Sequence, residues 1–429
     1  MSLKSDFEAF CANIEPDNLD EMKTTAGEIA KKLNAVYYSL ENDATSHLYI
    51  VGSVGRNTAI KNNSDLDLIF DLPQSIYTKF DKYKQNGQSA LLQEIKDCLS
   101  ERYPKTNISG DGQVVVIEFT KYIVELVPGF KQSDDRFKYP DTHDGGIWKY
   151  TDPLREQEEC ANAEKCADSS YGKYSNSCRL IRAWKNKIGF QFGGLLIDTL
   201  VYNAFKNNNY YKDKDEYYDI FLSVLTYLKN CDEKQSYWLA VGSNQQVKNT
   251  NNGKFVTKAK KSLIKIEKAN NKNDVLRELL GSGFPKSSTT HSKYYSQKFK
   301  DTEQFIENIL PVDIRYDVEL ECRISQDGWR PTLLSDLLRN HGLLRKKKNL
   351  DFYIVRTNCP KPYNIFWKIR NVGDVAEERD CIRGQIKMTN SDHQKEHTDF
   401  QGEHYVECYL VKNNICVAKG HIDVPIGIC

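Results

Sequence analysis

The spacing of apolar residues divides the chain into stretches that favour helices and stretches that favour strands. Residues 5–45 place apolar side chains three to four positions apart, which is the spacing of one helix face. Residues 46–130 contain short apolar runs of strand length, interrupted near 88–102 by a second helical pattern. Helical spacing returns at residue 148 and continues to about 285. This order predicts a sheet with associated helices, followed by a group of helices.

The last part of the chain carries the clearest alternation. Between Val312 and Ile324 every even position is apolar, and the odd positions between them are charged. A period of two predicts an antiparallel strand with one buried face. More strand-like runs follow, and Lys412-Asn413-Asn414 predicts a hairpin turn between the last two. Residues 313–429 are therefore predicted to form a β-sandwich, after a polar linker and a short helix over 286–312.

One motif carries candidate chemistry. The apolar run 48–51 ends at Gly52-Ser53, and twelve residues after Ser53 comes Asp65-Leu66-Asp67. In a strand, Asp65 and Asp67 point to the same face. Two carboxylates on one face form an oxygen-rich site of the kind that Mg²⁺ prefers. The motif predicts metal-assisted phosphoryl or nucleotidyl transfer.

The order of strand, Gly-Ser turn and Asp-x-Asp strand resembles the active-site signature of polymerase-β-type nucleotidyltransferases. The fuller pattern GSxxRxT…SDLDL resembles the cGAS/DncV-like branch, the CD-NTases. The resemblance implies an α+β, bilobal fold, with a catalytic core of mixed sheet over 1–147 and a helical lobe over 148–285. It implies two Mg²⁺ ions as cofactors, with Mn²⁺ as a substitute. It also implies nucleotide contacts from the turn and the residues after it: Gly52, Ser53, Arg56 and Thr58.

That family uses a third carboxylate on a neighbouring strand. Glu125 stands at the corresponding position, shortly before a proline at the end of an apolar run. The family's usual residue there is Asp, so the longer Glu is a departure. Glu118, on the preceding run, is the alternative, although its ordinary role would be an outward-facing charge on a hairpin. We expect Asp65, Asp67 and Glu125 to be the catalytic and metal-binding residues.

A helix is predicted over 174–187, with basic residues recurring along one flank. Spacing alone would make this flank a solvated surface. In the resembled family the same helix contributes a basic residue to the nucleotide phosphates, and Arg182 occupies that position, with Lys185 as the second candidate. The family's Ser-x-x-x-Glu on the following helix is replaced here by Gly194 and Asp198.

The predicted sandwich resembles the adenylyl/guanylyl and SMODS C-terminal (AGS-C) sensor domain. The resemblance rests on the pattern WxxRNxG beginning at Trp367, on Arg383-Gly384, and on Gly402-x-His404. It implies a domain that senses a nucleotide-like ligand. The residues expected to shape a pocket are Trp367, Asn371, Arg383 and His404, with Trp367 stacking on a base and Arg383 meeting a phosphate.

Charge and composition limit the classes of partner that the sequence predicts. The formal net charge of +1 creates no global field for nucleic acid, and 28% charged residues indicate a soluble surface. No apolar stretch approaches the roughly 18 residues of a membrane span, and the first ten residues lack a signal-peptide pattern. The twelve cysteines are scattered without a CxxC pair. These features predict a cytoplasmic protein with no membrane or strong nucleic-acid partner.

The sequence thus predicts a synthase that makes a cyclic oligonucleotide second messenger from NTPs in bacterial anti-phage (CBASS) signalling and acts on a downstream effector through its product. Two alternatives use the same residues. One is a nucleotidyltransferase that forms a linear product or tags another substrate. The other is a non-catalytic nucleotide-binding sensor.

Overall fold

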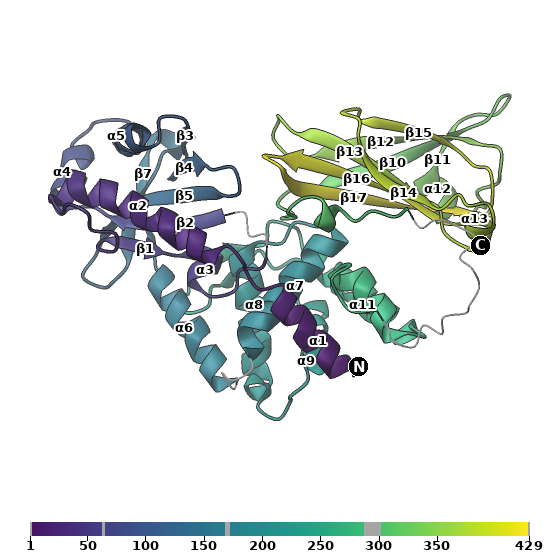
Figure 1. Cartoon of the computed structure of the whole chain (residues 1–429), viewed down its shortest axis with the longest axis horizontal. Helices are drawn as coiled ribbons and strands as arrows, with labels where there is room; N and C mark the ends of the chain where they lie inside the picture. Colours follow the sequence, from purple (N-terminus) through teal and green to yellow (C-terminus); the bar gives the residue numbers. More distant parts are fainter. Residues whose placement is uncertain (1, 62–64, 168–171, 287–301, 428–429) are drawn as a thin grey trace. The chain divides into compact units, whose positions relative to one another are not determined.

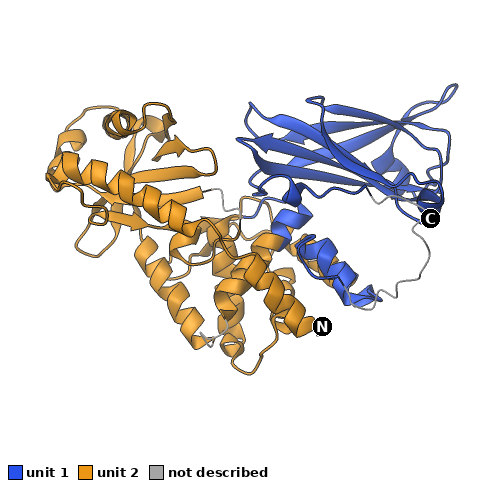
Figure 2. Cartoon of the chain, viewed as in Figure 1, with its two compact units in different colours: residues 1, 184–192, 265–429 blue, residues 2–183, 193–264 orange. Residues whose placement is uncertain are grey.

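The computed structural model describes residues 2–61, 65–167, 172–286 and 302–427, which form two compact units (Figure 2). The larger unit comprises residues 2–183 and 193–264. The smaller comprises residues 184–192 and everything described from 265 onward. Ser64 of the SDLDL motif and most of the predicted linker lie outside the described residues.

A seven-stranded mixed sheet organises the first half of the larger unit. Its strands are β1 (Leu48–Ile50), β2 (Asp65–Asp71), β3 (Asn107–Asp111), β4 (Val114–Glu118), β5 (Ile123–Lys131), β6 (Phe137–Asp141) and β7 (Ile147–Thr151). The main path runs β1-β2-β5-β4-β3, and β6 extends from β5 to β7. Strands β2 and β5 pair in parallel, whereas the other pairs are antiparallel. The predicted hairpin between residues 114 and 130 is confirmed as β4–β5.

Two helices, α2 (Leu19–Tyr38) and α5 (Gly87–Arg102), cover one face of this sheet (Figure 1). Both were predicted from helical spacing. Their apolar stripes pack against alternate residues of the central strands, among them Leu66, Leu68 and Leu126, all fully buried. Because side chains alternate along a strand, burying these positions directs the intervening residues of β2 and β5 to the opposite face.

The rest of the larger unit is mainly helical. Its elements are α1 (Leu3–Asn13), α4 (Gln74–Asp81), α6 (Pro153–Cys166), α7 (Lys173–Ile188, up to residue 183), α8 (Gly194–Asn207), α9 (Tyr217–Lys229), the hairpin β8 (Tyr237–Leu239) with β9 (Gln246–Lys248), and α10 (Lys254–Lys268, up to residue 264). Helix α1 packs on α9 through Phe7, whose ring lies 6.0 Å from Tyr218 and 6.2 Å from Phe221. Among the described helices, none is both long and apolar enough to cross a membrane.

The smaller unit contains the predicted sandwich. One sheet has the order β11 (Thr332–Leu333), β10 (Val318–Ser325), β12 (Asn349–Thr357), β15 (His393–His397), and the other has β14 (Arg383–Met388), β13 (Asn364–Arg370), β16 (Gly402–Lys412), β17 (Ile415–Ile426). Short helices α12 (Leu334–Arg339) and α13 (Asp374–Glu378) connect strands. The hairpin turn at Asn413-Asn414 is confirmed, since both residues have positive φ, +51° and +60°. The predicted α+β fold with an antiparallel C-terminal sandwich is therefore confirmed.

Two local predictions in this unit were wrong. The strand predicted from Val312 begins only at Val318. Before it, the N–H groups of Asp313 and Arg315 donate to carbonyls of Cys416 and Val417, so this segment follows the start of β17 instead of extending β10. The short helix predicted after residue 302 is a single 3-10 turn, Ile306–Asn308. The unit also includes α11 (Lys272–Leu280) and residues 184–192, which the sequence placed in the helical lobe.

Candidate active site

The Gly-Ser turn lies against the acidic strand. Strand β1 ends at Ile50, and the one-turn helix α3 (Gly52–Gly55) follows. Gly52 has φ +62°, and a Cβ built on it would lie 1.7 Å from Oδ2 of Asp67. The neighbouring Val51 N–H donates to the Asp67 carbonyl at 2.9 Å. Glycine is therefore required at position 52 both by its backbone conformation and by the closeness of the carboxylate.

Strand register brings the predicted carboxylates to one face. Asp67 is directly opposite Glu125 in the parallel pair β2–β5, and Asp65 is opposite Ile123. The residues between them, such as Leu66 and Val124, are fully buried on the helix-covered face. Asp65, Asp67 and Glu125 therefore share the other face, with Asp67 and Glu125 on strands about 4.8 Å apart.

The register also separates the two candidate glutamates. On β4, Val116 is opposite Glu125, and Glu118 is opposite Ile123. Glu118 thus shares the face but lies two strands from β2, roughly 10 Å away by strand spacing. It accepts a hydrogen bond from Asn107 Nδ2 at 2.8 Å. The backbone arrangement favours Glu125 as the partner of Asp67.

The donor set suits Mg²⁺, because carboxylate oxygens are the ligands this hard cation takes. Gly52 adds a backbone turn without a side chain beside Asp67. In the part of the chain that the structure describes, no three His, Cys, Asp or Glu side chains converge as a ready-made metal site. The strands thus bring the carboxylates to neighbouring positions, and their side chains would have to turn together to share an ion.

The segment after the turn folds back on Ser53. The Ser53 carbonyl accepts hydrogen bonds from the N–H groups of Thr58, at 2.8 Å, and Ala59, at 3.1 Å. Arg179 of α7 holds the same segment, donating to the carbonyls of Ala59 at 3.0 Å and Asn57 at 3.1 Å. These contacts fix the chain that leaves the turn.

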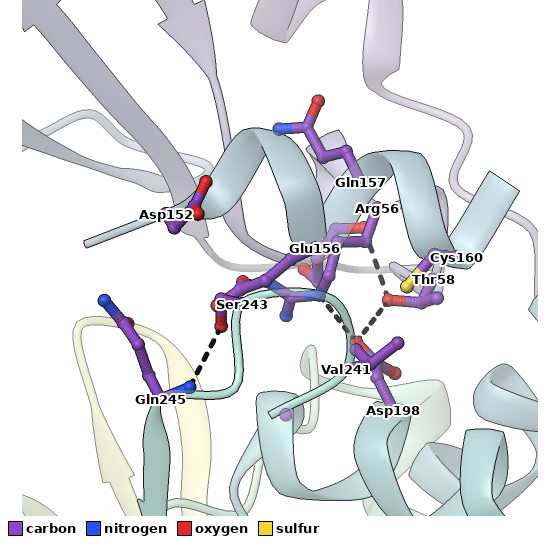
Figure 3. Close-up of polar contacts among 12 residues, drawn as sticks. Arg56, Thr58, Asp152, Glu156, Gln157, Cys160, Asp198, Val241, Ser243 and Gln245 are labelled. Carbon is purple, nitrogen blue, oxygen red and sulfur yellow. Dashed lines mark hydrogen bonds and ion pairs between the residues drawn. The ribbon is translucent and has the colours of Figure 1, made fainter. Parts of the chain in front are cut away.

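Arg56 and Thr58 point toward Asp198 of α8 (Figure 3). Arg56 Nε and Thr58 Oγ1 each donate to Asp198 Oδ2 at 2.9 Å. Arg182 of α7 forms a bidentate pair with the same carboxylate, at 2.5 and 2.9 Å. Glu156 of α6 accepts from Arg56 at 3.2 Å. The buried carboxylate of Asp198 therefore accepts hydrogen bonds from three of the predicted nucleotide-binding residues.

This cluster contains equal numbers of guanidinium and carboxyl groups, and its side chains are almost fully buried. The side chains of Arg182 and Asp198 are 7% and 0% exposed. Burial alone would raise the pKa of Asp198, but Arg182 and Arg56 lower it to about 2. Burial raises the pKa of Glu156, against the opposing effect of Arg56 and the Ser243 hydroxyl, which donates at 3.0 Å. Two guanidinium groups and two carboxyl groups thus join α6, α7, α8 and the segment after the Gly-Ser turn.

Lys185 has different neighbours. Helix α7 passes from the larger unit to the smaller one between residues 183 and 184, and Lys185 belongs to the smaller. Its ammonium group donates to Asp313 at 3.1 Å and to the Ile314 carbonyl at 2.7 Å. Asn186 binds the same segment, donating to the Val312 carbonyl at 2.8 Å. The structure therefore separates Lys185 from Arg182, although sequence reasoning grouped them.

Sequence reasoning did not foresee the roles of Asp198, Glu156 and Arg179. One signal was present: an Asp inside an otherwise apolar helix, GLLIDTLVYNAF, has to be paired when buried. The identity of its partners was not encoded locally, because Arg56 lies 142 residues away.

The four residues that were expected to shape a sensor pocket do not all line the same cavity. Asn371, Arg383 and His404 line one pocket of about 170 Å³ in the sandwich. Trp367 does not line it. This side chain is 1% exposed in the hydrophobic core, and its indole N–H donates to the Ser391 carbonyl at 2.9 Å. The expected stacking of Trp367 on a ligand base does not agree with this position.

Comparison with known proteins matches both halves of the chain. Residues 1–163, which contain the three carboxylates, match the family model of the Second Messenger Oligonucleotide or Dinucleotide Synthetase (SMODS) domain. Residues 300–427 match that of the Adenylyl/Guanylyl and SMODS C-terminal sensor domain. Together the two matches support the predicted combination of a SMODS-type synthetase domain with an AGS-C domain.

Solved CD-NTase structures are similar in fold over about two thirds of this chain. CdnC of E. coli MS115-1, solved with ATP, has 14% identity and a TM-score of 0.51, covering 66% of this chain and 99% of that one. CdnG of Bradyrhizobium diazoefficiens, in complex with GTP, has 10% identity and a TM-score of 0.51, covering 66% and 96%. No curated protein sequence matches significantly.

Proposed function

We propose that this chain is a Mg²⁺-dependent nucleotidyltransferase that joins NTPs into a cyclic oligonucleotide second messenger, in bacterial anti-phage (CBASS) signalling. The observation that carries the proposal is the strand register that sets Asp67 beside Glu125, with Asp65 on the same face. These residues lie inside the segment that matches the SMODS domain. The CdnC and CdnG structures with ATP and GTP support NTPs as the substrate class.

Asp65, Asp67 and Glu125 are the residues that would hold Mg²⁺. When bound, Mg²⁺ would neutralise triphosphate charge and stabilise the attacking and leaving oxygens. The three carboxylates share one face of a sheet whose other face is packed against helices. A site built on paired strands holds its ligands more closely than a loop would.

The reaction transfers a nucleotidyl group, through its α-phosphorus, to a ribose hydroxyl. A new P–O bond forms at the hydroxyl oxygen, the bond from the α-phosphorus to the bridging oxygen breaks, and pyrophosphate leaves. The hydroxyl proton goes to solvent. A second transfer of the same kind within the linear intermediate closes the ring and releases a second pyrophosphate. No Ser or His nucleophile is needed, since positioning and charge neutralisation supply most of the catalysis.

Gly52 and Ser53 are proposed to receive the terminal phosphates. Gly52 lets the turn approach Asp67 closely, and the Ser53 carbonyl is already engaged by Thr58 and Ala59. The Ser53 hydroxyl is the side-chain donor of this turn that would meet a phosphate.

Arg56, Thr58 and Arg182 are proposed to act first as positioning residues. Their donors meet at Asp198, so they hold the segment after the turn against α7 and α8. A nucleotide contact by Arg182 would require its guanidinium to leave a buried carboxylate, which is energetically costly.

The alternatives remain a linear or tagged product, or nucleotide binding without catalysis. Purified protein would be incubated with each NTP and with the mixture, in Mg²⁺ or Mn²⁺, and the products treated with phosphatase and separated by mass. Phosphatase-resistant cyclic products support the proposal. Products that lose terminal phosphates indicate a linear enzyme, and unchanged NTPs under all conditions indicate a non-catalytic binder. The Asp65→Asn/Asp67→Asn protein is the matched control.

A further inference from the structure

The pocket in the sandwich has an apolar floor that comes from both sheets. Strand β12 contributes to it from one sheet, and strands β13, β16 and β17 contribute from the other. The floor residues are Leu350, Phe352, Ile369, Val406, Val424 and Ile426. Its volume is about 170 Å³. A cavity of about 150 Å³ accepts a benzene ring, whereas drug-sized ligands occupy roughly 300–1,000 Å³. The pocket is thus suited to one flat ring system and too small for a dinucleotide.

The cation at the rim is already neutralised. Arg383, at the start of β14, forms two hydrogen bonds to Glu396 of β15, at 2.6 and 3.0 Å. Gln394 also donates to Glu396, at 2.8 Å. The guanidinium and the carboxylate therefore satisfy each other across the two sheets, and the guanidinium lacks the uncompensated charge that would attract a phosphate.

The other ionisable groups of the lining add negative charge. Asp399 pairs with His397 at 2.6 Å. His404 Nδ1 accepts the Val372 N–H at 3.1 Å, its Nε2 faces the Phe400 carbonyl, and burial lowers the pKa of His404, so this ring is neutral. The lining holds two carboxylates, those of Glu396 and Asp399, and one guanidinium, that of Arg383, which Glu396 already neutralises. A phosphate would be repelled at this rim.

Asn371 offers a neutral recognition group. Its Nδ2 donates to the Cys381 carbonyl at 2.7 Å and, in a longer contact, to Cys381 Sγ at 3.8 Å. Within the described residues, no donor is assigned to its Oδ1. A primary amide presents a donor and an acceptor side by side, which is how asparagine reads an adenine edge. Phe400 and Tyr405 add aromatic walls.

We propose that this pocket binds a single uncharged heteroaromatic ring of nucleobase size, with its apolar faces on the floor and its polar edge at Asn371, and that it discriminates against phosphorylated nucleotides. This reverses the expectation from sequence that Arg383 meets a phosphate. It assigns the sandwich a ligand chemistry distinct from that of the NTP site. The proposal does not depend on the proposed catalytic function.

Calorimetry on the full chain tests it. The Asp65→Asn/Asp67→Asn protein, in EDTA, would be titrated with adenine, adenosine and AMP. We expect adenine and adenosine to bind with dissociation constants below about 1 mM, and AMP at least tenfold more weakly than adenosine. Absence of binding by adenine, guanine, cytosine and uracil at millimolar concentration would overturn the proposal, as would AMP binding as tightly as adenosine.

Variants of Asn371 test whether the heat of ligand binding arises from this pocket. Asn371→Leu should weaken adenine binding at least tenfold, and Asn364→Leu, at an exposed position on the same strand, should leave it unchanged. Asn371→Asp keeps the shape and should also lose binding, which covers the case in which Asn371→Leu fails to fold. Equal binding by the folded Asn371 variant and the wild type would place the ligand elsewhere and refute the assignment.

Glu396→Gln tests the charge argument. Removing this carboxylate leaves Arg383 without its partner, so AMP affinity relative to adenosine should rise at least fivefold. An unchanged ratio would show that charge at the rim does not select the ligand.

Discussion

Two arginine–carboxylate pairs with the same bidentate geometry lie in the two units and differ in burial. Arg182 and Asp198 in the larger unit are 7% and 0% exposed, whereas Arg383 and Glu396 in the sandwich are 40% and 17% exposed. Removing one partner of a buried pair strongly destabilises the folded protein, because the remaining charge stays unpaired in a low-dielectric interior. A pair at a rim contributes about 1 kcal/mol or less.

The two arginine–carboxylate pairs therefore have different roles. In the larger unit the pair joins helices α7 and α8 and, through Arg56, holds the segment beside the Gly-Ser turn. In the sandwich the pair contributes little to stability and instead sets the charge that a ligand meets.

The largest expected effect is on turnover. Asp65→Asn/Asp67→Asn should lower product formation on the order of 10⁴-fold, about 5.5 kcal/mol of transition-state stabilisation, because each carboxylate contributes charge to the metal site. The melting temperature should stay near that of wild type. Retention of more than a few per cent of activity would mean that these are the wrong carboxylates.

Asp198→Asn should destabilise the larger unit by about 3–5 kcal/mol, because Arg182 and Arg56 would remain buried without their carboxylate. Denaturant unfolding measures this loss. Glu396→Gln is the matched control from the exposed pair and should lose no more than about 1 kcal/mol. Equal losses in the two variants would remove the distinction on which the comparison rests.

Glu125→Gln should lower turnover on the order of 10²-fold, about 2.7 kcal/mol, because Glu125 is opposite Asp67. Glu118→Gln should be near neutral, since Glu118 is two strands from β2 and bonds to Asn107. Steady-state kinetics at saturating NTP would rank the two. The reverse ranking would identify Glu118 as the third carboxylate.

Acid should weaken the buried pair in a defined pH window. The pKa of Asp198 is lowered to about 2 in the folded protein, against about 3.9 when unfolded. Its contribution of about 2–3 kcal/mol is therefore complete above about pH 5 and is lost as the pH falls toward 2. The stability difference between wild type and Asp198→Asn should narrow between pH 5 and pH 3. A difference independent of pH would contradict the low pKa.

The smallest stability effect concerns the rim. Arg383→Gln should change the unfolding free energy by no more than about 1 kcal/mol, because both members of the pair reach solvent. Differential scanning calorimetry on the full chain, with Lys387→Gln on the same strand as control, measures it. A loss as large as that of Asp198→Asn would show that this pair is structural.

Local patterns predicted much of the fold. Helical spacing identified α2 and α5, and the Gly-Ser and Asp-x-Asp spacing identified the strands that carry the site. Sequence patterns predicted the structure less well where residues far apart in the sequence form the backbone hydrogen bonds. Residues 312–317 alternate like a strand, yet their N–H groups bind β17, so the alternation did not extend β10.

The candidate site was predictable in part, for the same physical reason. That Asp65 and Asp67 share a face follows from the period of two within one strand. That Asp67 lies beside Glu125 depends on parallel pairing between β2 and β5, which a sequence pattern does not specify. Arg182 looked like one of several basic residues on a helix flank, and only the buried Asp198 explains its position.

The sequence by itself determined which residues alternate, where turns fall, and that an acidic strand follows a Gly-Ser turn, because these depend on neighbours a few positions apart. Only the tertiary structure decided which charges are buried together. Asp198 meets Arg56 from 142 residues away, and Arg383 meets Glu396 across two sheets. Burial, and with it the low pKa of Asp198 and the neutralised rim of the sandwich pocket, arises when such distant segments pack, since packing excludes the water that would otherwise screen each charge.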